Sequence, residues 1–257
     1  MSTEGADGGC EYSIQIADSI DHISEIDIEF QAIYLDPPYD LSRTHRYSAV
    51  LDGPEFKDTW DGDEYSIWLD RMVTACKSVL AKDGTLFLHI SAEQSLVPEM
   101  VLAKHFAKVE KILWQKAHGK NTVKKKLGAV VDIIFMASTN NRKFNLVYVP
   151  LDDYYFENSY TQRDERGLYA LGAIKHDKTR KGHFYTVTHS KTGETYEVPY
   201  GWRFPEEEMQ RMISENRIHF PQMKGATLYK KLYKHESKGK PLSNLWDDVH
   251  YITRTDQ

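Results

Sequence analysis

A run of apolar residues near residue 30 ends abruptly in four residues that cannot continue a strand. The sequence reads QAIYLDPPYDLS, so the strand-like segment runs straight into Asp36-Pro37-Pro38-Tyr39. Proline has no backbone N–H and a fixed φ, so two adjacent prolines stop a strand and leave the nearby carbonyl groups without sheet partners. The chain must therefore leave its sheet here. An ordinary turn with an acid at its first position would also fit these residues.

A rigid carboxylate beside a main-chain carbonyl suits one kind of chemistry. The exocyclic amine of adenine or cytosine is a poor nucleophile, because its lone pair is delocalised into the ring. Asp36 and the carbonyl of Pro37 can accept both amine hydrogens, and the ring of Tyr39 can stack on a base flipped out of the duplex. We therefore interpret Asp36, Pro37, Pro38 and Tyr39 as candidate catalytic residues, at the carboxyl end of a strand where open α/β sheets place their sites.

The segments around and beyond this tetrapeptide resemble a known family. DPPYD followed by YSIWLDRMVTACKSVLAKDGTLFLHIS resembles the amino-group DNA methyltransferases that use S-adenosylmethionine, in the class whose catalytic motif precedes the cofactor-binding motif. VPYGWRFPEEEMQRMISENRIHFPQ and LYKKLYKHESKGKPLSNLWDDV are similar to adenine-specific modification subunits of restriction systems. The resemblance implies methylation of an adenine amine in duplex DNA at a defined sequence, and it places Asp36 and Pro38 beside the cofactor. The tetrapeptide chemistry alone would serve cytosine equally and does not exclude RNA.

The glycine-rich turn that this family uses for S-adenosylmethionine is missing from the sequence. In the family it reads Phe-x-Gly-x-Gly and, in this motif order, it follows the recognition region, whereas this sequence ends in LWDDVHYITRTDQ. Three explanations stay open: one subunit of a split enzyme, a catalytically inactive DNA-binding or assembly subunit, or a fragment of a longer protein. The intact tetrapeptide favours the first or the third. Because an incomplete sheet exposes an unpaired edge, we expect a protein partner that carries the glycine-rich loop, or self-association.

Alternating strand and helix patterns predict an α/β core over residues 12–139, an incomplete Rossmann-like methyltransferase sheet. Strands are expected at EYSIQIAD, FQAIYLD, KDGTLFLHIS (after a glycine turn), KVEKILWQK and GAVVDIIFMAS, and helices at SIDHISEI, residues 63–80 and EQSLVPEMVLAKHF. FQAIYLD is almost wholly apolar, which is typical of a strand buried on both faces. Residues 41–62 have no period and predict a structureless loop over the site. The apolar stripe of the helix at 63–80 comprises Ile67, Trp68, Met72, Val73, Cys76, Val79 and Leu80.

The composition of the sequence changes near residue 140. Residues 140–235 are rich in tyrosine and show little helical period at first, and we interpret them as an α+β target-recognition region inserted into the core. A hairpin is expected around Lys191-Thr192-Gly193 and a helix in PEEEMQRMISENRI, with Pro205 just inside its start. Residues 236–257 then form a tail that leads toward the missing cofactor segment.

Charge is distributed unevenly along the chain. The net charge is −5, but residues 1–64 carry 3 basic and 16 acidic side chains (−13), which leaves 30 basic and 22 acidic side chains (+8) in the remainder. The segment 104–126 holds eight lysines and one glutamate. Basic clusters of this kind suit contact with DNA phosphates, although a solvated loop is the simpler explanation. The candidate DNA-contacting residues are Arg43, Arg46, Lys120, Lys124, Lys125 and Lys126.

Several classes of function are not indicated. The two cysteines, Cys10 and Cys76, cannot form a disulfide framework and lack the close cysteine or histidine neighbours of a zinc site, so no metal is expected. No apolar run has the length of a membrane span, and the N-terminus does not resemble a signal peptide, so we expect a cytoplasmic protein without a membrane partner. His89, at the end of a predicted strand, is interpreted as a core histidine with satisfied hydrogen bonds.

Overall fold

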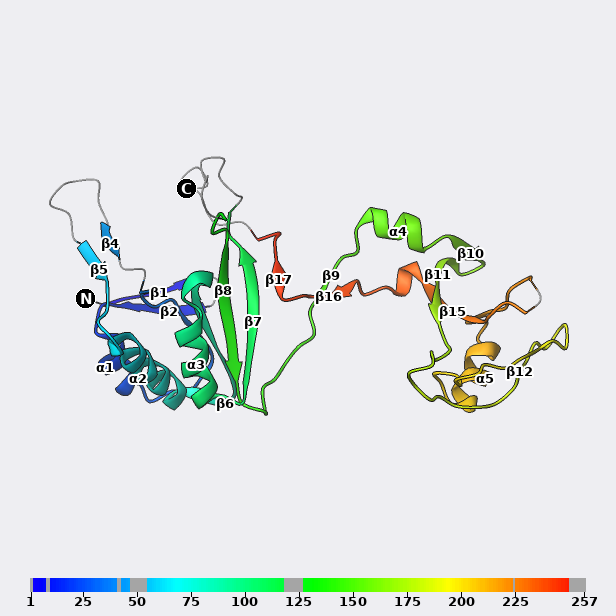
Figure 1. Cartoon of the computed structure of the whole chain (residues 1–257), viewed down its shortest axis with the longest axis horizontal. Coiled ribbons are helices and arrows are strands. Elements are labelled where there is room, and N and C mark those ends of the chain that lie inside the picture. The colour runs from blue at the N-terminus through cyan, green and yellow to red at the C-terminus, as the bar shows by residue number, and fades with distance from the viewer. Residues whose placement is uncertain are drawn as a thin grey trace. The chain divides into compact units, whose positions relative to one another are not determined.

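A five-stranded mixed sheet in the order β17-β7-β8-β6-β3 organises the first of two structural units (Figure 1). The computed structural model describes residues 2–7, 10–40, 43–46, 55–117, 127–223 and 225–249, and it divides the chain into residues 1–145 with 243–257 and residues 146–242. The strands of the sheet are β3 (Phe30–Leu35), β6 (Leu80–Ser91), β7 (Lys108–Gln115), β8 (Val131–Ser138) and β17 (Leu245–Trp246).

The strand directions make the sheet mixed. β3 runs parallel to β6, β8 runs antiparallel to both β6 and β7, and β17 runs parallel to β7. Between the strands lie α1 (Ser19–Ser24), η1 (Ala92–Gln94) and α3 (Leu96–His105), together with α2 (Glu64–Ser78). The predicted α/β class is therefore confirmed, with strands and helices close to the expected positions.

Most of the stripe predicted for helix α2 and the residues after it is buried, since Met72, Val73, Cys76, Val79 and Leu80 all lie in the core. The buried residues of the helix itself are Tyr65, Leu69, Met72, Val73 and Cys76. Positions i, i+4, i+7, i+8 and i+11 share one face at 3.6 residues per turn, whereas a residue at i+2 points about 200° away. Ile67 is accordingly 60% exposed, so its place in the predicted stripe was wrong.

Strand β3 is not buried on both faces, which corrects the prediction from its apolar sequence. It lies at an end of the sheet, with β6 as its neighbour, and its burial is only partial along its length. Tyr34 is 59% exposed. The strand's position in the sheet, rather than its composition, decides how much of it is covered.

The segment at 41–62 contains a hairpin, although a structureless loop was predicted. β4 (Arg43–Arg46) pairs antiparallel with β5 (Glu55–Asp58), so backbone groups that a loop would leave open pair with one another. Near the N-terminus, β1 (Ser2–Asp7) and β2 (Cys10–Gln15) also form a hairpin. The predicted strand EYSIQIAD therefore pairs outside the main sheet, and part of the glycine-containing start lies in a strand.

Strand β6 runs unbroken through Gly84, where a turn was predicted. A Cβ atom on Gly84 would lie 3.0 Å from the carbonyl oxygens of Ala81 and Gln31. The register between β3 and β6 shifts between Phe30 and Ala32, beside this close approach. Glycine is needed here for space between two backbones.

The second unit contains a four-stranded sheet in the order β10-β11-β15-β14. Its strands are β10 (Gln162–Asp164), β11 (Gly167–Ala173), β14 (Ile218–His219) and β15 (Tyr229–Tyr233). The other elements are β9 (Tyr148–Val149), α4 (Asp153–Ser159), β12 (Val187–Thr188), β13 (Thr195–Tyr196), α5 (Glu206–Ser214), η2 (Lys234–Glu236) and β16 (Lys240–Pro241).

Two predictions for this unit are confirmed and one element was missed. β12 pairs with β13 around Gly193, which has a φ of 71°, and α5 begins directly after Pro205. Helix α4 was not predicted, but the side chain of Asp152 caps it by accepting the N–H of Tyr155 at 2.6 Å. Trp202, 1% exposed, lies in the core of this unit.

The turn after β3 is held by a buried side chain from β5. Asp58 is 2% exposed, and its carboxylate accepts the N–H of Tyr39 at 3.2 Å and the N–H of Asp40 at 2.7 Å. Asp40 has a φ of 55°, the left-handed region, which allows the chain to reverse after the prolines. The carboxylate of Asp58 thus accepts hydrogen bonds from two backbone N–H groups that have no partner in a strand.

Two further side chains hold the carbonyl groups of the same turn. The hydroxyl of Tyr65, on α2, donates to the carbonyl of Pro38 at 2.9 Å. The side-chain amide of Gln94, on η1, donates to the carbonyl of Asp40 at 3.1 Å. Three separate elements therefore fix the turn.

Replacing Asp58 by alanine is expected to loosen this turn while the sheet stays folded. Buried backbone donors left without an acceptor cost roughly 1–3 kcal/mol, so the amides of Tyr39 and Asp40 should exchange hydrogen at least about tenfold faster. Hydrogen exchange followed by NMR measures this, with core amides of β8 as the internal reference. The matched control is Asp63→Ala, since Asp63 makes no side-chain bond to the helix that follows it. Unchanged exchange at Tyr39 and Asp40 would contradict the role of Asp58.

Candidate active site

The carboxylate of Asp36 lies at the carboxyl end of β3 with one oxygen engaged and one open. Oδ1 accepts the hydroxyl of Tyr39 at 2.6 Å and lies 3.4 Å from Nδ1 of His89. Within the described residues Oδ2 has no hydrogen-bond partner, and the side chain is 57% exposed. The hydrogen bond from His89 lowers the pKa of Asp36, so the group is ionised at neutral pH and accepts hydrogen bonds.

The two proline carbonyls of the turn differ. The carbonyl of Pro38 is taken by Tyr65, whereas in the described part of the chain no hydrogen bond reaches the carbonyl of Pro37. The ring of Pro37 is itself buried, which fixes its backbone. An open carbonyl and an open carboxylate oxygen therefore come from adjacent residues.

The ring of Tyr39 lies edge-on against His89, with ring centroids 5.7 Å apart. Burial and the neighbouring Asp36 carboxylate raise the pKa of the Tyr39 hydroxyl well above its ordinary value. The hydroxyl therefore stays protonated and acts as a donor to Asp36.

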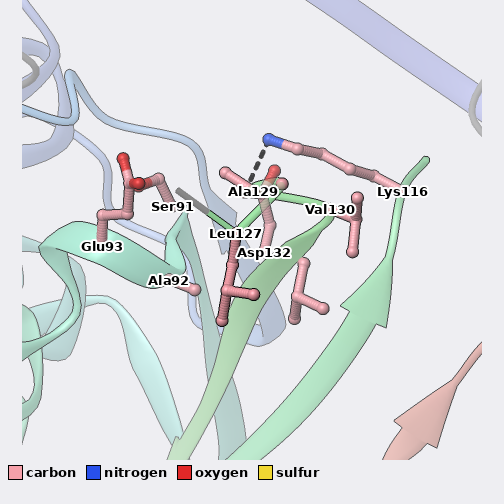
Figure 2. Close-up of a pocket in the computed structure, with 10 residues that line it drawn as sticks. Ser91, Ala92, Glu93, Lys116, Leu127, Ala129, Val130 and Asp132 are labelled. Carbon is pink, nitrogen blue, oxygen red and sulfur yellow. Dashed lines mark hydrogen bonds and ion pairs between the residues drawn. The ribbon is translucent and has the colours of Figure 1, made fainter. Parts of the chain in front are cut away.

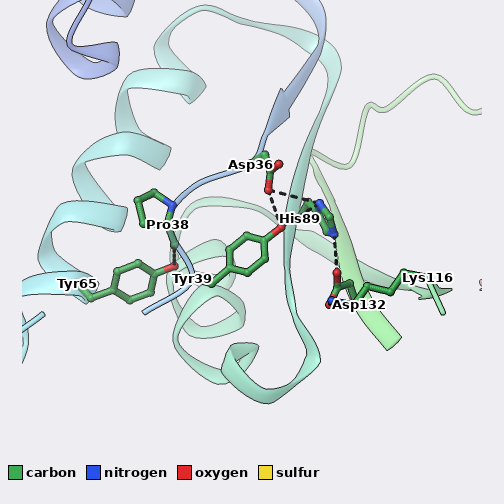
Figure 3. A network of polar contacts seen from close by, with 7 residues as sticks. All are labelled: Asp36, Pro38, Tyr39, Tyr65, His89, Lys116 and Asp132. Atoms are coloured by element: carbon green, nitrogen blue, oxygen red, sulfur yellow. Dashed lines mark hydrogen bonds and ion pairs between the residues drawn. The ribbon is translucent and has the colours of Figure 1, made fainter. Parts of the chain in front are cut away.

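His89 occupies the centre of this site, where sequence reasoning expected an ordinary core histidine. It is 8% exposed, and its Nε2 lies 3.3 Å from Oδ2 of Asp132 on β8 (Figure 3). Asp132 Oδ1 in turn accepts Nζ of Lys116 at 2.7 Å. Burial alone would lower the pKa of His89, but the hydrogen bonds to Asp132 and Asp36 outweigh it and raise the pKa to about 9.

The sequence did hold a signal for this network. His89 and Asp132 each interrupt an otherwise apolar strand, in LFLHIS and VVDIIF. A polar residue in a buried strand needs a partner, and adjacent strands are the place to seek one. What the sequence lacked was the strand order that makes β6 and β8 neighbours.

A pocket of about 420 Å³ opens beside the network (Figure 2). Asp132 and Lys116 line it, together with Ser91 and Glu93 and the segment 127–131. The hydroxyl of Ser91 is buried and has no hydrogen-bond partner among the described residues. The pocket wall thus carries the acidic side chains of Glu93 and Asp132 and the cationic side chain of Lys116.

The structure describes the side chain of none of the candidate DNA-contacting residues. Lys120, Lys124, Lys125 and Lys126 lie outside the described residues. Arg43 and Arg46 lie in β4, and the structure describes their backbone but not their side chains.

Three other lysines of the segment 104–126 pair with acids of the protein itself. Lys104 lies 3.5 Å from Asp70, Lys111 lies 2.6 Å from Glu99, and Lys116 contacts Asp132. The excess of lysine in the sequence therefore overstates the charge available to a phosphate backbone.

The described residues carry neither a metal site nor a membrane span. No group of three or more metal-ligating side chains comes together in them. None of their helices has the length and apolar character that a bilayer crossing requires.

Comparison with known proteins agrees with the resemblance seen in the sequence. The StyLTI Mod subunit of a type III restriction-modification enzyme from Salmonella typhimurium is 23% identical over 244 residues, which covers 84% of this chain and 37% of that protein. The DNA adenine methyltransferase YhdJ from Escherichia coli is 25% identical over 115 residues, 44% of this chain and 36% of that protein. The chain thus spans little more than a third of the length of either relative.

The family comparison covers more of the chain than either relative does alone. The family described as DNA methylase matches residues 30–255, which include the turn after β3, the strands of the main sheet and the whole second unit. The chain therefore belongs to the DNA methylase family.

Proposed function

We propose that this chain carries the catalytic and target-recognition residues of a site-specific DNA adenine methyltransferase that uses S-adenosylmethionine. The observation that carries the proposal is the pair of open acceptors at the end of β3. Oδ2 of Asp36 and the carbonyl of Pro37 are both without partners within the described residues. A fixed pair of acceptors on adjacent residues is what the two hydrogens of an exocyclic amine require.

The residues of the turn would prepare the amine for reaction. If Asp36 and the carbonyl of Pro37 each accept one amine hydrogen, the nitrogen is drawn toward a tetrahedral geometry and its lone pair points outward. When bound, S-adenosylmethionine supplies an electrophilic methyl group. The Asp36 carboxylate, which accepts one amine hydrogen, would be placed to take the proton that the methylated nitrogen gives up. The ring of Tyr39 would stack on the flipped base.

The pocket beside the network is a plausible receptor for part of the flipped nucleotide. A volume of about 420 Å³ exceeds that of a purine ring. Asp132 lines the pocket and reaches Asp36 through His89, so pocket and turn are linked by direct contacts.

The described residues fit the acceptor side of the site better than the cofactor side. A glycine that follows a strand of the main sheet and opens a helix would let the backbone close around the methionine part of the cofactor. Among the described glycines none has this position. We therefore propose that a further segment, in a longer form of this chain or in a partner, pairs along the free edge of β3 and completes the pocket. Among the described strands, β3 lies at one end of the main sheet and pairs only with β6.

The second unit is proposed to read the target sequence. The chain leaves the main sheet after β8 and returns to it as β17, so residues 146–242 form an insertion with a core of their own. The insertion carries 16 basic and 13 acidic side chains, a balance of +3, against −13 for residues 1–64. Exposed Tyr154 and Phe184, 77% and 65% accessible, are available to contact bases or sugars.

Calorimetric titration of S-adenosylmethionine into the purified chain tests the cofactor proposal. Because the glycine turn is not among the described residues and no described strand pairs with the outer edge of β3, we expect no one-to-one binding by this chain alone. Clear one-to-one binding would contradict completion by another segment. Asp36→Ala is titrated in parallel, so that any binding found can be related to the turn.

Replacing Asp36 by alanine tests the catalytic proposal. In the form of the protein that transfers methyl groups to DNA, we expect kcat to fall at least about a hundredfold, because an acceptor preorganised for the reacting amine is lost. The dissociation constant for duplex DNA should stay nearly unchanged, and Asp63→Ala should behave like the wild type. Joint loss of transfer and DNA binding would indicate a structural role for Asp36. Specific DNA binding by a wild type that never methylates would instead support a non-catalytic assembly subunit.

A further inference from the structure

Both ring nitrogens of His89 face a carboxylate. Nδ1 lies 3.4 Å from Asp36 Oδ1, and Nε2 lies 3.3 Å from Asp132 Oδ2. A neutral imidazole has one N–H, so one of its nitrogens would turn a lone pair toward a negative oxygen. Only the imidazolium donates at both ends. The geometry therefore specifies a charged histidine in a buried place.

Tyr39 fits the same assignment of hydrogens. Its hydroxyl donates to Asp36 Oδ1 at 2.6 Å, so the hydroxyl oxygen is free to accept from Nδ1 of His89 at 3.2 Å. The N–H of Nδ1 is thus shared between the carboxylate and the phenol oxygen. One histidine contacts both the proposed acceptor and the proposed stacking ring.

Aromatic rings surround the charged imidazole. The ring centroids of Tyr34, Tyr39 and Trp114 lie 6.3, 5.7 and 5.6 Å from that of His89. Tyr39 meets the imidazole in an edge arrangement, and the rings of Tyr34 and Trp114 are tilted to it, so these contacts hold the side chain of His89 in place. His89 is only 8% exposed, and the attraction between its ring and the two carboxylates is stronger there than in bulk water.

The charges alternate along the network. Lys116 contacts Asp132, Asp132 contacts His89, and His89 contacts Asp36, so two cations and two anions follow one another (Figure 3). A neutral histidine would leave two carboxylates against one lysine in a half-buried site. The raised pKa of His89, about 9, agrees with this balance, although burial works against it.

We propose that His89 is a positioning residue, which as an imidazolium held by Asp132 orients the Asp36 carboxylate toward the amine of the target base. This inference rests on the proposed function, because it assigns a role relative to Asp36. With Oδ1 held by His89 and Tyr39, Oδ2 is directed away from the network and left for the amine. His89 keeps its proton throughout and is not the base that receives the amine proton.

Two binding partners of His89 give isosteric variants that test the charge. Asp132→Asn and Asp36→Asn each remove one negative oxygen while the side-chain shape stays the same. Asp70→Asn is the matched control, since Asp70 pairs with another histidine, His105, at 3.1 Å. All variants are made in the full chain.

Histidine ring NMR of the labelled protein measures the charge without DNA or cofactor. The His89 signal is identified by its absence in His89→Gln. We expect it to keep the chemical shift of an imidazolium until about pH 9. Asp132→Asn and Asp36→Asn should each move its titration down by about one unit or more, as loss of a nearby opposite charge does. The Asp70→Asn control should leave it unchanged. Titration of wild-type His89 at or below its ordinary pKa, or a titration that Asp132→Asn does not move, would overturn the proposal.

The pH profile of methyl transfer links the charge to catalysis. In Asp132→Asn we expect kcat to fall at a lower pH than in the wild type, and to recover as the pH is lowered. Recovery at low pH is not expected from a merely structural defect. An equal loss of kcat at every pH would count against positioning by charge. If the NMR result holds and the wild type transfers no methyl group at any pH, the proposed function fails while the charged histidine stands.

Discussion

The turn that ends β3 cannot be held by the hydrogen bonds that hold the rest of the sheet. Two of its residues have no N–H, and the chain reverses directly after them, so its remaining donors and acceptors must find partners elsewhere. Asp58 takes the two N–H groups of Tyr39 and Asp40, and Tyr65 takes the carbonyl of Pro38. Since these partners come from separate elements, the turn is rigid only when β5 and α2 are both in place. Rigidity matters because two acceptors can polarise one amine only if they hold a fixed spacing.

Electrostatics adds a second condition on the same turn. A carboxylate at a protein surface rotates freely and is well solvated. It therefore does not hold a substrate in one orientation. Asp36 is exposed on one side, yet its other side meets a buried histidine backed by Asp132 and Lys116. Burying charges is costly unless each has a partner, and the alternation of sign supplies one for every member. If the proposed function is right, the free-energy cost of burying these charges is met at the place where the network holds the catalytic carboxylate of Asp36.

Much of the fold and the centre of the candidate site could be predicted from the sequence, because they depend on local pattern. Helical and strand periodicity placed β3, β6, β7 and β8 of the main sheet but not β17, which fell in the predicted tail, and the prolines placed the turn. Two errors were local, the place of Ile67 in the stripe of α2 and the missed helix α4, and the others concern non-local facts. Phe30–Leu35 reads as a buried strand, but its neighbours decide burial, and the sequence does not name them. His89 reads as a core residue for the same reason, since its partners Asp36 and Asp132 lie 53 and 43 positions away.

The edge position of β3 connects these points. An acceptor that works on a flipped base and a methyl donor together must be reachable by both, which a fully enclosed strand would prevent. β3 has β6 on one side, where His89 contacts Asp36, and no strand of the described part of the chain pairs with its other side. If a cofactor-binding segment pairs along that edge, completing the sheet and completing the active site are one event. The exposed edge would then be covered only in the assembled enzyme, so methyl transfer would depend on assembly.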